Sequence, residues 1–269
     1  MKRLLVANKQ VDNRLRYTHG NMELMLKAQI ENLLELGWKI EDLILLCNFD
    51  FEFMGVKGTQ IPFNEFCLTG SKMFALKWLM ENDPQDDITY SADLDAWQSV
   101  FFDCPEFEGD VGACQYSNPK WNGGSIFWKP SSKDIVEKVV ETIQKEEAPK
   151  EEPVLNRIFR MPEYINRITK LDYTYNVGCS GFTPRYSRSI KPLRVCHFHP
   201  FNSIAWEMHA LDREDLGEIA ITVRLERLLR RYFEGLAVQL SAKTIRRQQQ
   251  IKELGYNPKD RKRGKKQKK

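Results

Sequence analysis

Short apolar runs alternate with amphipathic helical repeats along the first half of the chain. Residues 3–7 (RLLVA) and 42–47 (DLILLC) are typical of buried parallel strands. Between them, residues 21–36 carry apolar side chains near helical spacing, and Gly37 supplies a stop signal. This strand–helix–strand order predicts an α/β fold with a mainly parallel sheet flanked by helices. Ligands of such sheets bind outside the carboxyl ends of the strands.

The same alternation extends through most of the chain, although the later elements are shorter. The further elements predicted are, in chain order, a helix at 69–81, strands at 88–91, 111–116 and 122–128, a helix at 133–143, a short helix at 153–159, a strand at 193–196 and a helix within 213–240. The charged segment 145–153 (KEEAPKEEP) is predicted to be an exposed loop.

Positive charge is concentrated at the C-terminal end of the chain, and this asymmetry suggests how the chain is divided into regions. Residues 241–269 hold twelve basic and two acidic residues, a net charge of +10, so the rest of the chain carries −6 of the total of +4. We therefore predict an α/β domain at residues 1–210, a helical C-terminal extension at 211–242, and a basic tail at 243–269. Because the tail has few apolar side chains, it is predicted to be disordered on its own.

Composition excludes several classes of protein. No segment approaches the roughly 18 consecutive apolar residues that a membrane span needs, and the apolar run 4–7 is too short for a signal peptide. The chain is therefore predicted to be cytoplasmic (in the host cytoplasm, if it is viral) and to have no membrane span. None of the six cysteines forms a CxxC pair, so reduced buried thiols are expected rather than a zinc ribbon.

Two carboxylates one residue apart, Asp93 and Asp95, follow the strand predicted at residues 88–91. Side chains at positions i and i+2 of an extended segment point the same way, so both carboxylates can converge on one hard cation. Mn²⁺ or Mg²⁺ suits such oxygen ligands and would neutralise charge on a departing nucleotide diphosphate. Acidic pairs are also common in solvated turns, and the position directly after a strand is what favours the metal site.

The order of short motifs between Leu4 and Pro200 resembles that of GT-A glycosyltransferases, and most closely the glycogenin-type family, glycosyltransferase family 8. The motifs that carry the resemblance are Ser71-Lys72 at a helix start, Asp93-Leu-Asp95, Asn122-Gly-Gly-Ser125, Glu151-Glu-Pro-Val-Leu-Asn156 and Val195-Cys-His197-Phe198. The resemblance implies a GT-A (Rossmann-like) fold, a nucleotide-sugar donor such as a UDP-sugar, and retention of configuration. The chain departs from the family where His199-Pro-Phe-Asn replaces the usual G-x-x-K-P-W segment.

The resemblance also implies a role for each matched residue. The metal ligands would be Asp93, Asp95 and His197. The catalytic residues would be Asp95, Glu152 and Asn122, with Glu152 facing the reacting carbon. The donor would be contacted by Lys72, Asn122, Gly123, Ala7, Asn8 and His199. Ordinary structural alternatives remain for these residues: a strand-end histidine, a helix-start surface charge at Lys72, a strand bulge at the glycines, and a solvated charge run at Glu152.

The sequence therefore indicates a metal-dependent glycosyltransferase, either a hexosyl- or a pentosyltransferase. The basic tail suits a polyanion, because each lysine or arginine that neutralises a phosphate releases counterions. A modified base in viral DNA is accordingly one predicted acceptor, and a protein, a glycan or a lipid-linked sugar are the others. Two further readings stay open. A nucleotidyltransferase also uses paired carboxylates, although residues 7–11 lack the glycine-rich loop of that class. The other is a non-catalytic nucleic-acid-binding protein.

Overall fold

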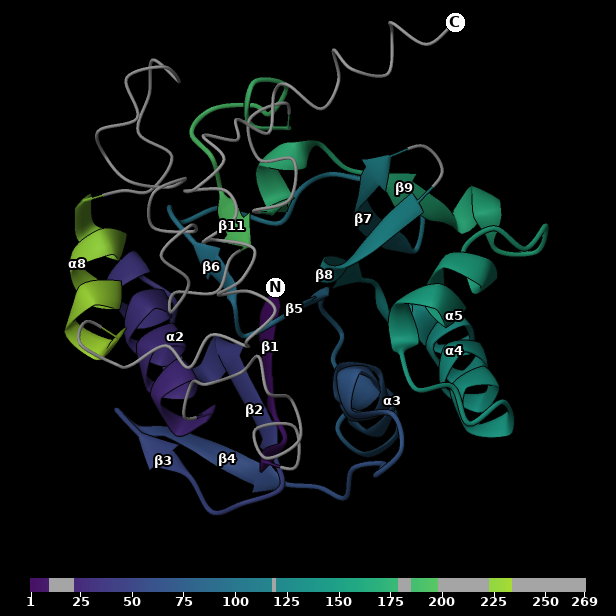
Figure 1. Ribbon diagram of the computed structural model, residues 1–269, viewed down its shortest axis with the longest axis horizontal. Coiled ribbons are helices and arrows are strands. Elements are labelled where there is room, and N and C mark those ends of the chain that lie inside the picture. Colours follow the sequence, from purple (N-terminus) through teal and green to yellow (C-terminus); the bar gives the residue numbers. More distant parts are fainter. Residues whose placement is uncertain (10–21, 118–119, 179–184, 198–222, 234–269) are drawn as a thin grey trace, which may run out of the picture.

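A mostly parallel sheet of eight strands forms the centre of the protein (Figure 1). The computed structural model describes residues 1–9, 22–117, 120–178, 185–197 and 223–233. In spatial order the strands are β3 (Glu52–Phe53), β4 (Val56–Gln60), β2 (Leu43–Cys47), β1 (Lys2–Ala7), β5 (Thr89–Ala92), β8 (Lys120–Trp128), β7 (Val111–Ser117) and β9 (Ile168–Lys170). The predicted α/β class is confirmed, and β8 runs antiparallel to both of its neighbours.

The order of the strands reverses beside β1. From β1 the chain builds outward through β2 and β4, and it then returns to add β5 on the other side of β1. Where the chain leaves two neighbouring parallel strands toward opposite edges of the sheet, a crevice opens at the carboxyl ends of these strands. The fold therefore predicts a ligand site after β1 and β5, which is where Asn8 and Asp93 lie.

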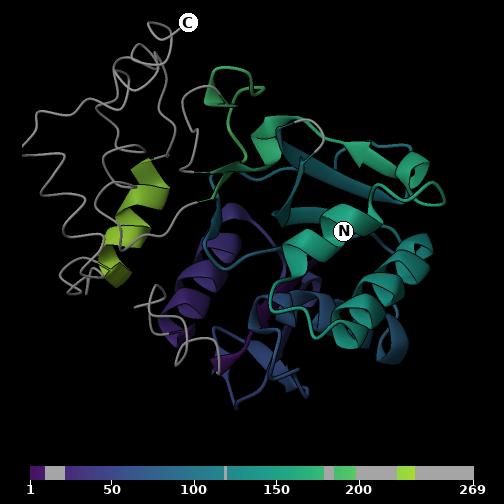
Figure 2. The ribbon, with the colours of Figure 1, turned by 45° about the vertical axis from the view of Figure 1, so that its right-hand side comes forward.

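Helices cover both faces of the sheet, as the apolar pattern predicted (Figures 1 and 2). The helices are α2 (Met22–Leu36), α3 (Ser71–Asn82), α4 (Lys133–Lys145), α5 (Glu151–Ile158) and α8 (Val223–Phe233). Successive side chains of a strand point to opposite faces. Leu4 of β1 accordingly packs in the cluster of α3, α4 and α5, and its neighbour Leu5 packs in the cluster of α2.

A second sheet of three short strands stands beside the first. Its strands, in spatial order, are β10 (Val177–Gly178), β11 (Val195–His197) and β6 (Ala96–Gln98). β11 was predicted from sequence, and β6 and β10 were not. Because β11 pairs antiparallel with β6, His197 lies opposite Ala96 and thus beside the carboxylate pair.

Two predicted helix starts differ from the structure by two residues. The helix predicted from residue 69 begins with a 3-10 turn, Leu68–Gly70, before α3. The helix predicted from residue 153 begins at Glu151, so the end of the predicted exposed loop is the first turn of α5. A proline in the first turn does not break a helix, because the N–H it lacks has no intrahelical acceptor there. The other 3-10 turns are Ile40–Asp42, Pro130–Ser132, Ile165–Arg167 and Tyr173–Tyr175.

The predicted C-terminal helix is present as α8, which packs on α2. Its apolar side chains Leu225, Leu228, Leu229 and Phe233 lie in one cluster with Met25 and Ala28 of α2. The boundary predicted at residue 210 and the basic tail 243–269 lie outside the described residues. Within the described ranges, no helix combines the length and the apolar character that crossing a membrane requires. The cysteines described there are free thiols.

Candidate functional site

The carboxylate pair lies in a tight connection between the two sheets. The N–H of Asp93 donates to Gly124 O at 3.0 Å, which holds the end of β5 against β8. The N–H of Ala96 donates back to Asp93 O at 3.0 Å and closes a turn. Asp93 and Asp95 therefore converge because the chain turns between them. The sequence predicted an extended backbone at these residues, and that prediction is wrong. The predicted convergence of the two carboxylates is nevertheless observed.

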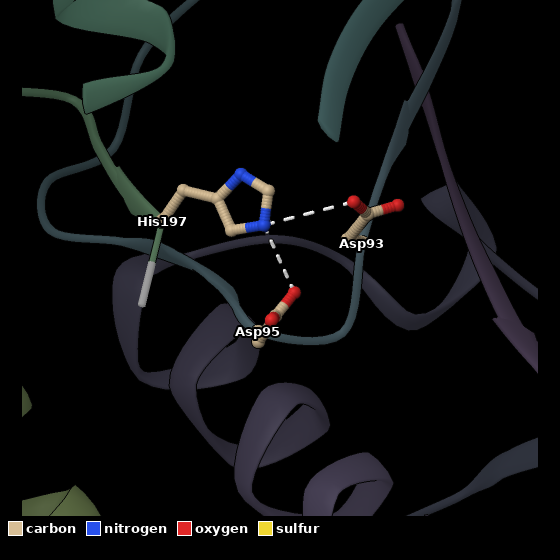
Figure 3. Close-up of side chains that lie close together, drawn as sticks. All are labelled: Asp93, Asp95 and His197. Atoms are coloured by element: carbon tan, nitrogen blue, oxygen red, sulfur yellow. Dashed lines mark hydrogen bonds and ion pairs between the residues drawn. The ribbon is translucent and has the colours of Figure 1, made fainter. Parts of the chain in front are cut away.

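His197 completes a group of three possible metal ligands (Figure 3). Its Nε2 lies 3.0 Å from Asp95 Oδ1 and 3.6 Å from Asp93 Oδ2. One ligand atom from each residue lies within 4.8 Å of the others, and all three residues are partly exposed. Two carboxylates and an imidazole form a mixed O/N donor set that suits a divalent cation such as Mn²⁺. The residues present thus fit the metal that the resemblance implies.

Without a metal, the carboxylates favour a charged histidine. Burial alone would lower the pKa of His197, but the carboxylates of Asp95 and Asp93 outweigh it and raise the pKa above its usual value. An imidazolium cannot bind a metal, so a cation must displace the proton. The other ring nitrogen, Nδ1, lies 3.2 Å from Oδ1 of Asn176, a residue that no sequence motif indicated.

Gly124 makes room for this histidine. A Cβ atom at position 124 would overlap Cε1 and Nδ1 of the His197 ring. The predicted donor residue Asn122 is buried, and its Oδ1 accepts a hydrogen bond from the N–H of Gly124 at 2.8 Å. The Asn-Gly-Gly motif therefore shapes β8 beside the candidate metal ligands. A contact of Asn122 with a sugar stays a prediction.

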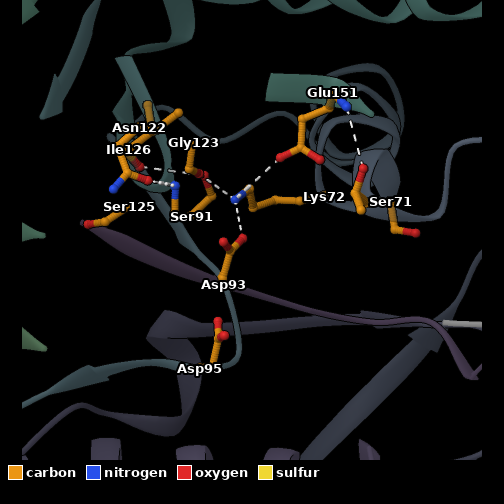
Figure 4. Close-up of polar contacts among 12 residues, drawn as sticks. Ser71, Lys72, Ser91, Asp93, Asp95, Asn122, Gly123, Ser125, Ile126 and Glu151 are labelled. Atoms are coloured by element: carbon orange, nitrogen blue, oxygen red, sulfur yellow. Dashed lines mark hydrogen bonds and ion pairs between the residues drawn. The ribbon is translucent and has the colours of Figure 1, made fainter. Parts of the chain in front are cut away.

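Lys72 is buried at the centre of the site (Figure 4). Its Nζ donates to Asp93 Oδ1 and to Gly123 O, each at 2.5 Å, and lies 3.9 Å from Glu151 Oε1. Burial favours the neutral amine, but Asp93 and Glu151 outweigh it and raise the pKa of Lys72. With a side chain only 6% exposed, Lys72 is not the surface charge of the alternative interpretation. It is a fixed cation next to Asp93, a candidate metal ligand.

The two glutamates of α5 occupy different surroundings. Glu151 is buried against Lys72, and burial raises its pKa to about 8, with Lys72 opposing the shift. Glu152 is 32% exposed, and its Oε1 lies 3.8 Å from Lys120 Nζ. The resemblance assigns the chemistry to Glu152, which stays a prediction, and no role was predicted for the buried Glu151. A signal was present, because Glu151 shares a helix face with Leu155 and Ile158, both buried.

The remaining predicted donor residues lie at the carboxyl end of β1. Ala7 is fully buried. Asn8 donates from Nδ2 to Ser71 Oγ at 2.9 Å and accepts from Asn48 Nδ2 at 3.0 Å. Asn8 is thereby tied to the first turn of α3, directly beside Lys72. His199, the last predicted donor contact, lies outside the described residues.

Comparison with known proteins identifies the fold. No protein-family model matches the sequence, and no curated protein matches it. The structure matches galactosyltransferase LgtC, solved with donor and acceptor sugar analogues, with a TM-score of 0.53 at 12% identity over 85% of this chain and 100% of that one. It matches the glycosyltransferase GlyE of Streptococcus pneumoniae with a TM-score of 0.50 at 13% identity, over 86% of this chain and 62% of that one.

A third match is a glycosyltransferase involved in glycosylation of the major capsid of PBCV-1, with a TM-score of 0.50 at 11% identity over 77% of this chain and 98% of that one. At these identities, the likeness establishes the fold and leaves the activity to the site. The chain has the GT-A fold of glycosyltransferases, and the resemblance that its motifs carry is confirmed at the level of the fold.

Proposed function

We propose that this protein is a metal-dependent glycosyltransferase that moves a sugar from a nucleotide-diphosphosugar donor to an acceptor. The observation that carries the proposal is the convergence of Asp93, Asp95 and His197, whose ligand atoms lie within 4.8 Å of one another. They meet where the strand order reverses in a GT-A fold, which is the place where such sheets bind ligands. Buried Lys72 beside Asp93 adds a cation suited to phosphate.

Each residue then has a definite task. Asp93, Asp95 and His197 would hold Mn²⁺ or Mg²⁺, which when bound offsets the charge that develops on the leaving diphosphate. Lys72 supplies a second positive charge whose position is fixed by Gly123 O and Asp93. Because these charges are in place before the donor arrives, little reorganisation is needed during transfer. We assign Glu152 to the acceptor side, where it faces the reacting carbon, and we propose retention of configuration on the family resemblance.

A donor panel tests the proposal without knowledge of the acceptor. Nucleotide sugars are incubated with the protein and Mn²⁺, and release of nucleotide diphosphate is measured. We expect one donor, a UDP-sugar, to be hydrolysed slowly, with the activity lost in EDTA and reduced at least a hundredfold in Asp95→Asn. Asp86→Asn, a matched change at an exposed carboxylate, should behave as wild type. If no donor is either bound or hydrolysed, the proposal fails.

For the acceptor, we propose a modified base in DNA, such as a hydroxymethylated one, reached by extrusion from the duplex. The support comes from the charge of +10 in residues 241–269, which suits a polyanion. Deletion of residues 246–269 should weaken DNA binding and flatten its dependence on salt, while donor hydrolysis stays unchanged. Unaltered DNA affinity in the truncated chain would leave protein, glycan and lipid-linked sugars as the acceptors to test.

A further inference from the structure

Asn176 lies behind His197, on the side of the ring that faces away from the carboxylates. The residue is 1% exposed, and its Oδ1 lies 3.2 Å from His197 Nδ1. The other ring nitrogen, Nε2, is the one that lies near Asp95 and Asp93. We propose that Asn176 is a positioning residue that holds His197 in the tautomer and orientation that present Nε2 to the metal. This inference rests on the proposed metal-dependent function.

The small sheet fixes the relative position of the two residues. Asn176 directly precedes β10, and β10 pairs in parallel with β11, so that Gly178 is the register partner of His197. The N–H of Asn176 donates to Tyr173 O at 2.9 Å, which anchors its backbone to the preceding 3-10 turn. The imidazole is thus carried by a paired strand, and the amide by the residue that joins a 3-10 turn to a paired strand.

The chemistry of a metal-bound imidazole selects one arrangement. When Nε2 gives its lone pair to a metal, the proton of the neutral ring is on Nδ1 and needs an acceptor. Oδ1 of Asn176 is placed to be that acceptor. If the amide were turned over, its N–H₂ group would donate to Nδ1, the ring proton would move to Nε2, and that proton would point at Asp95 and block the metal.

The rest of the amide group is consistent with this role. Nδ2 of Asn176 is buried and has no hydrogen-bond partner in the described part of the chain. A buried unpaired donor costs free energy, so its retention needs a reason. The oxygen on the other branch of the amide supplies that reason. A leucine of similar volume would fill the space without an unpaired donor, but it would leave Nδ1 without an acceptor.

Metal affinity, measured without any donor sugar, tests the inference. Binding of Mn²⁺ to the full chain is followed by electron paramagnetic resonance. We expect Asn176→Leu to raise the Kd for Mn²⁺ by about 10- to 100-fold, the usual effect of removing a partner of a ligating histidine. Asn176→Asp keeps an acceptor oxygen at the same place and should bind Mn²⁺ nearly as tightly as wild type. Asn32→Leu, the same change at a buried amide that bonds Gln98 O, is the control and should leave the Kd unchanged.

A double-mutant cycle separates positioning from general damage to the fold. In a His197→Ala background, Asn176→Leu should cause no further loss of Mn²⁺ affinity, because its effect passes through the ring. An equal further loss in that background would overturn the inference. A measurement on the wild type does not depend on whether a variant folds. With Mg²⁺ bound, the ¹⁵N spectrum of His197 should show a protonated Nδ1 and an unprotonated Nε2. A ring protonated on Nε2 under those conditions would also overturn it.

The outcomes distinguish this inference from the proposed function. Unchanged Mn²⁺ affinity in Asn176→Leu, with donor hydrolysis in the wild type, overturns the role of Asn176 and leaves the glycosyltransferase proposal standing. Weakened Mn²⁺ binding in Asn176→Leu, with no donor bound or hydrolysed by the wild type, supports the role of Asn176 and overturns the proposed function. A wild type that binds no Mn²⁺ and neither binds nor hydrolyses a donor overturns both.

Discussion

Two neighbouring glycines of β8 meet different groups. A Cβ atom on Gly124 would overlap the ring of His197, whereas one on Gly123 would lie 3.4 Å from Glu151 Oε1, an ordinary contact distance. We therefore expect Gly124→Ala to push the imidazole away from the carboxylates and to weaken Mn²⁺ binding at least tenfold. Gly123→Ala is the matched control and should change the Kd little. Equal Mn²⁺ affinities for the two variants would contradict this account of the motif.

Glu151 is expected to make stability depend on pH. Its folded-state pKa is about 8, raised by burial, whereas an exposed glutamate titrates near 4.3. The folded state therefore holds this proton more tightly than the unfolded state. The resulting stability is fully present below about pH 4 and is lost progressively as the pH rises through about 8.

Glu151→Gln remains neutral at every pH and removes this dependence. The free energy of unfolding of the variant, relative to wild type, should increase steadily between about pH 5 and pH 8. Urea denaturation at several pH values measures the difference. Glu141→Gln makes the same chemical change on the exposed face of α4 and serves as the control. A difference that stays constant over this range would show that Glu151 carries no such proton.

At the scale of the elements, one arginine joins three segments near the edge strand β9. Arg167, the last residue of a 3-10 turn, donates to Asp110 Oδ2 at 2.5 Å, just before β7. It also donates to both oxygens of Asp134, in the first turn of α4, at 2.6 and 2.7 Å. The hydrogen bonds from Arg167 lower the pKa of Asp134. Burial opposes the effect at Asp110, but bonds from Ser131 and Arg167 lower its pKa as well.

Groups with a lowered folded-state pKa stabilise the fold above their unfolded pKa, near 4, and lose that contribution as the pH falls further. Arg167→Gln should therefore reduce the free energy of unfolding by about 1–2 kcal/mol at pH 7. A bidentate network stabilises the fold more than a single surface ion pair does. The loss should shrink toward pH 3. Lys133→Gln, which breaks an exposed pair 4.0 Å long with Glu137, is the control and should cost less than about 0.5 kcal/mol. Urea denaturation measures both variants. If Arg167→Gln lost the same free energy of unfolding at pH 7 and at pH 3, the stabilising role of the network would be refuted.

At the scale of the whole molecule, the sequence predicts the large sheet better than the small one. The runs at 3–7 and 42–47 are long enough to identify β1 and β2, and burial on both faces explains why they are continuously apolar. β6 and β10 have three and two residues, too few to show any alternation. Their existence follows from pairing with β11, which is a long-range property that no local pattern contains.

The same distinction applies to the site. Asp93 and Asp95 were predicted from their spacing after a strand, and His197 from the family resemblance. The structure brings the three together. Asn176 was not predicted, since it lies 21 residues before His197 and meets it only through the parallel pairing of β10 with β11. The sequence thus indicates which atoms would bind a metal, whereas the groups that orient those atoms depend on packing between distant segments.

The position of the candidate metal ligands would couple the site to the stability of the whole fold. Asp93 follows a strand of the large sheet, and His197 belongs to the small sheet, so one cation would join the two. A ligand that binds only the folded state stabilises it by RT ln(1 + [L]/Kd), about 2.7 kcal/mol when its concentration is one hundred times Kd. Saturating Mn²⁺ should therefore raise the Tm of the wild type by several degrees, and EDTA should reverse the rise. Asp95→Asn should show almost no rise, because it removes a charged ligand. A Tm increase of the same size in that variant would mean that Mn²⁺ binds elsewhere, and the coupling of the two sheets through this site would be refuted.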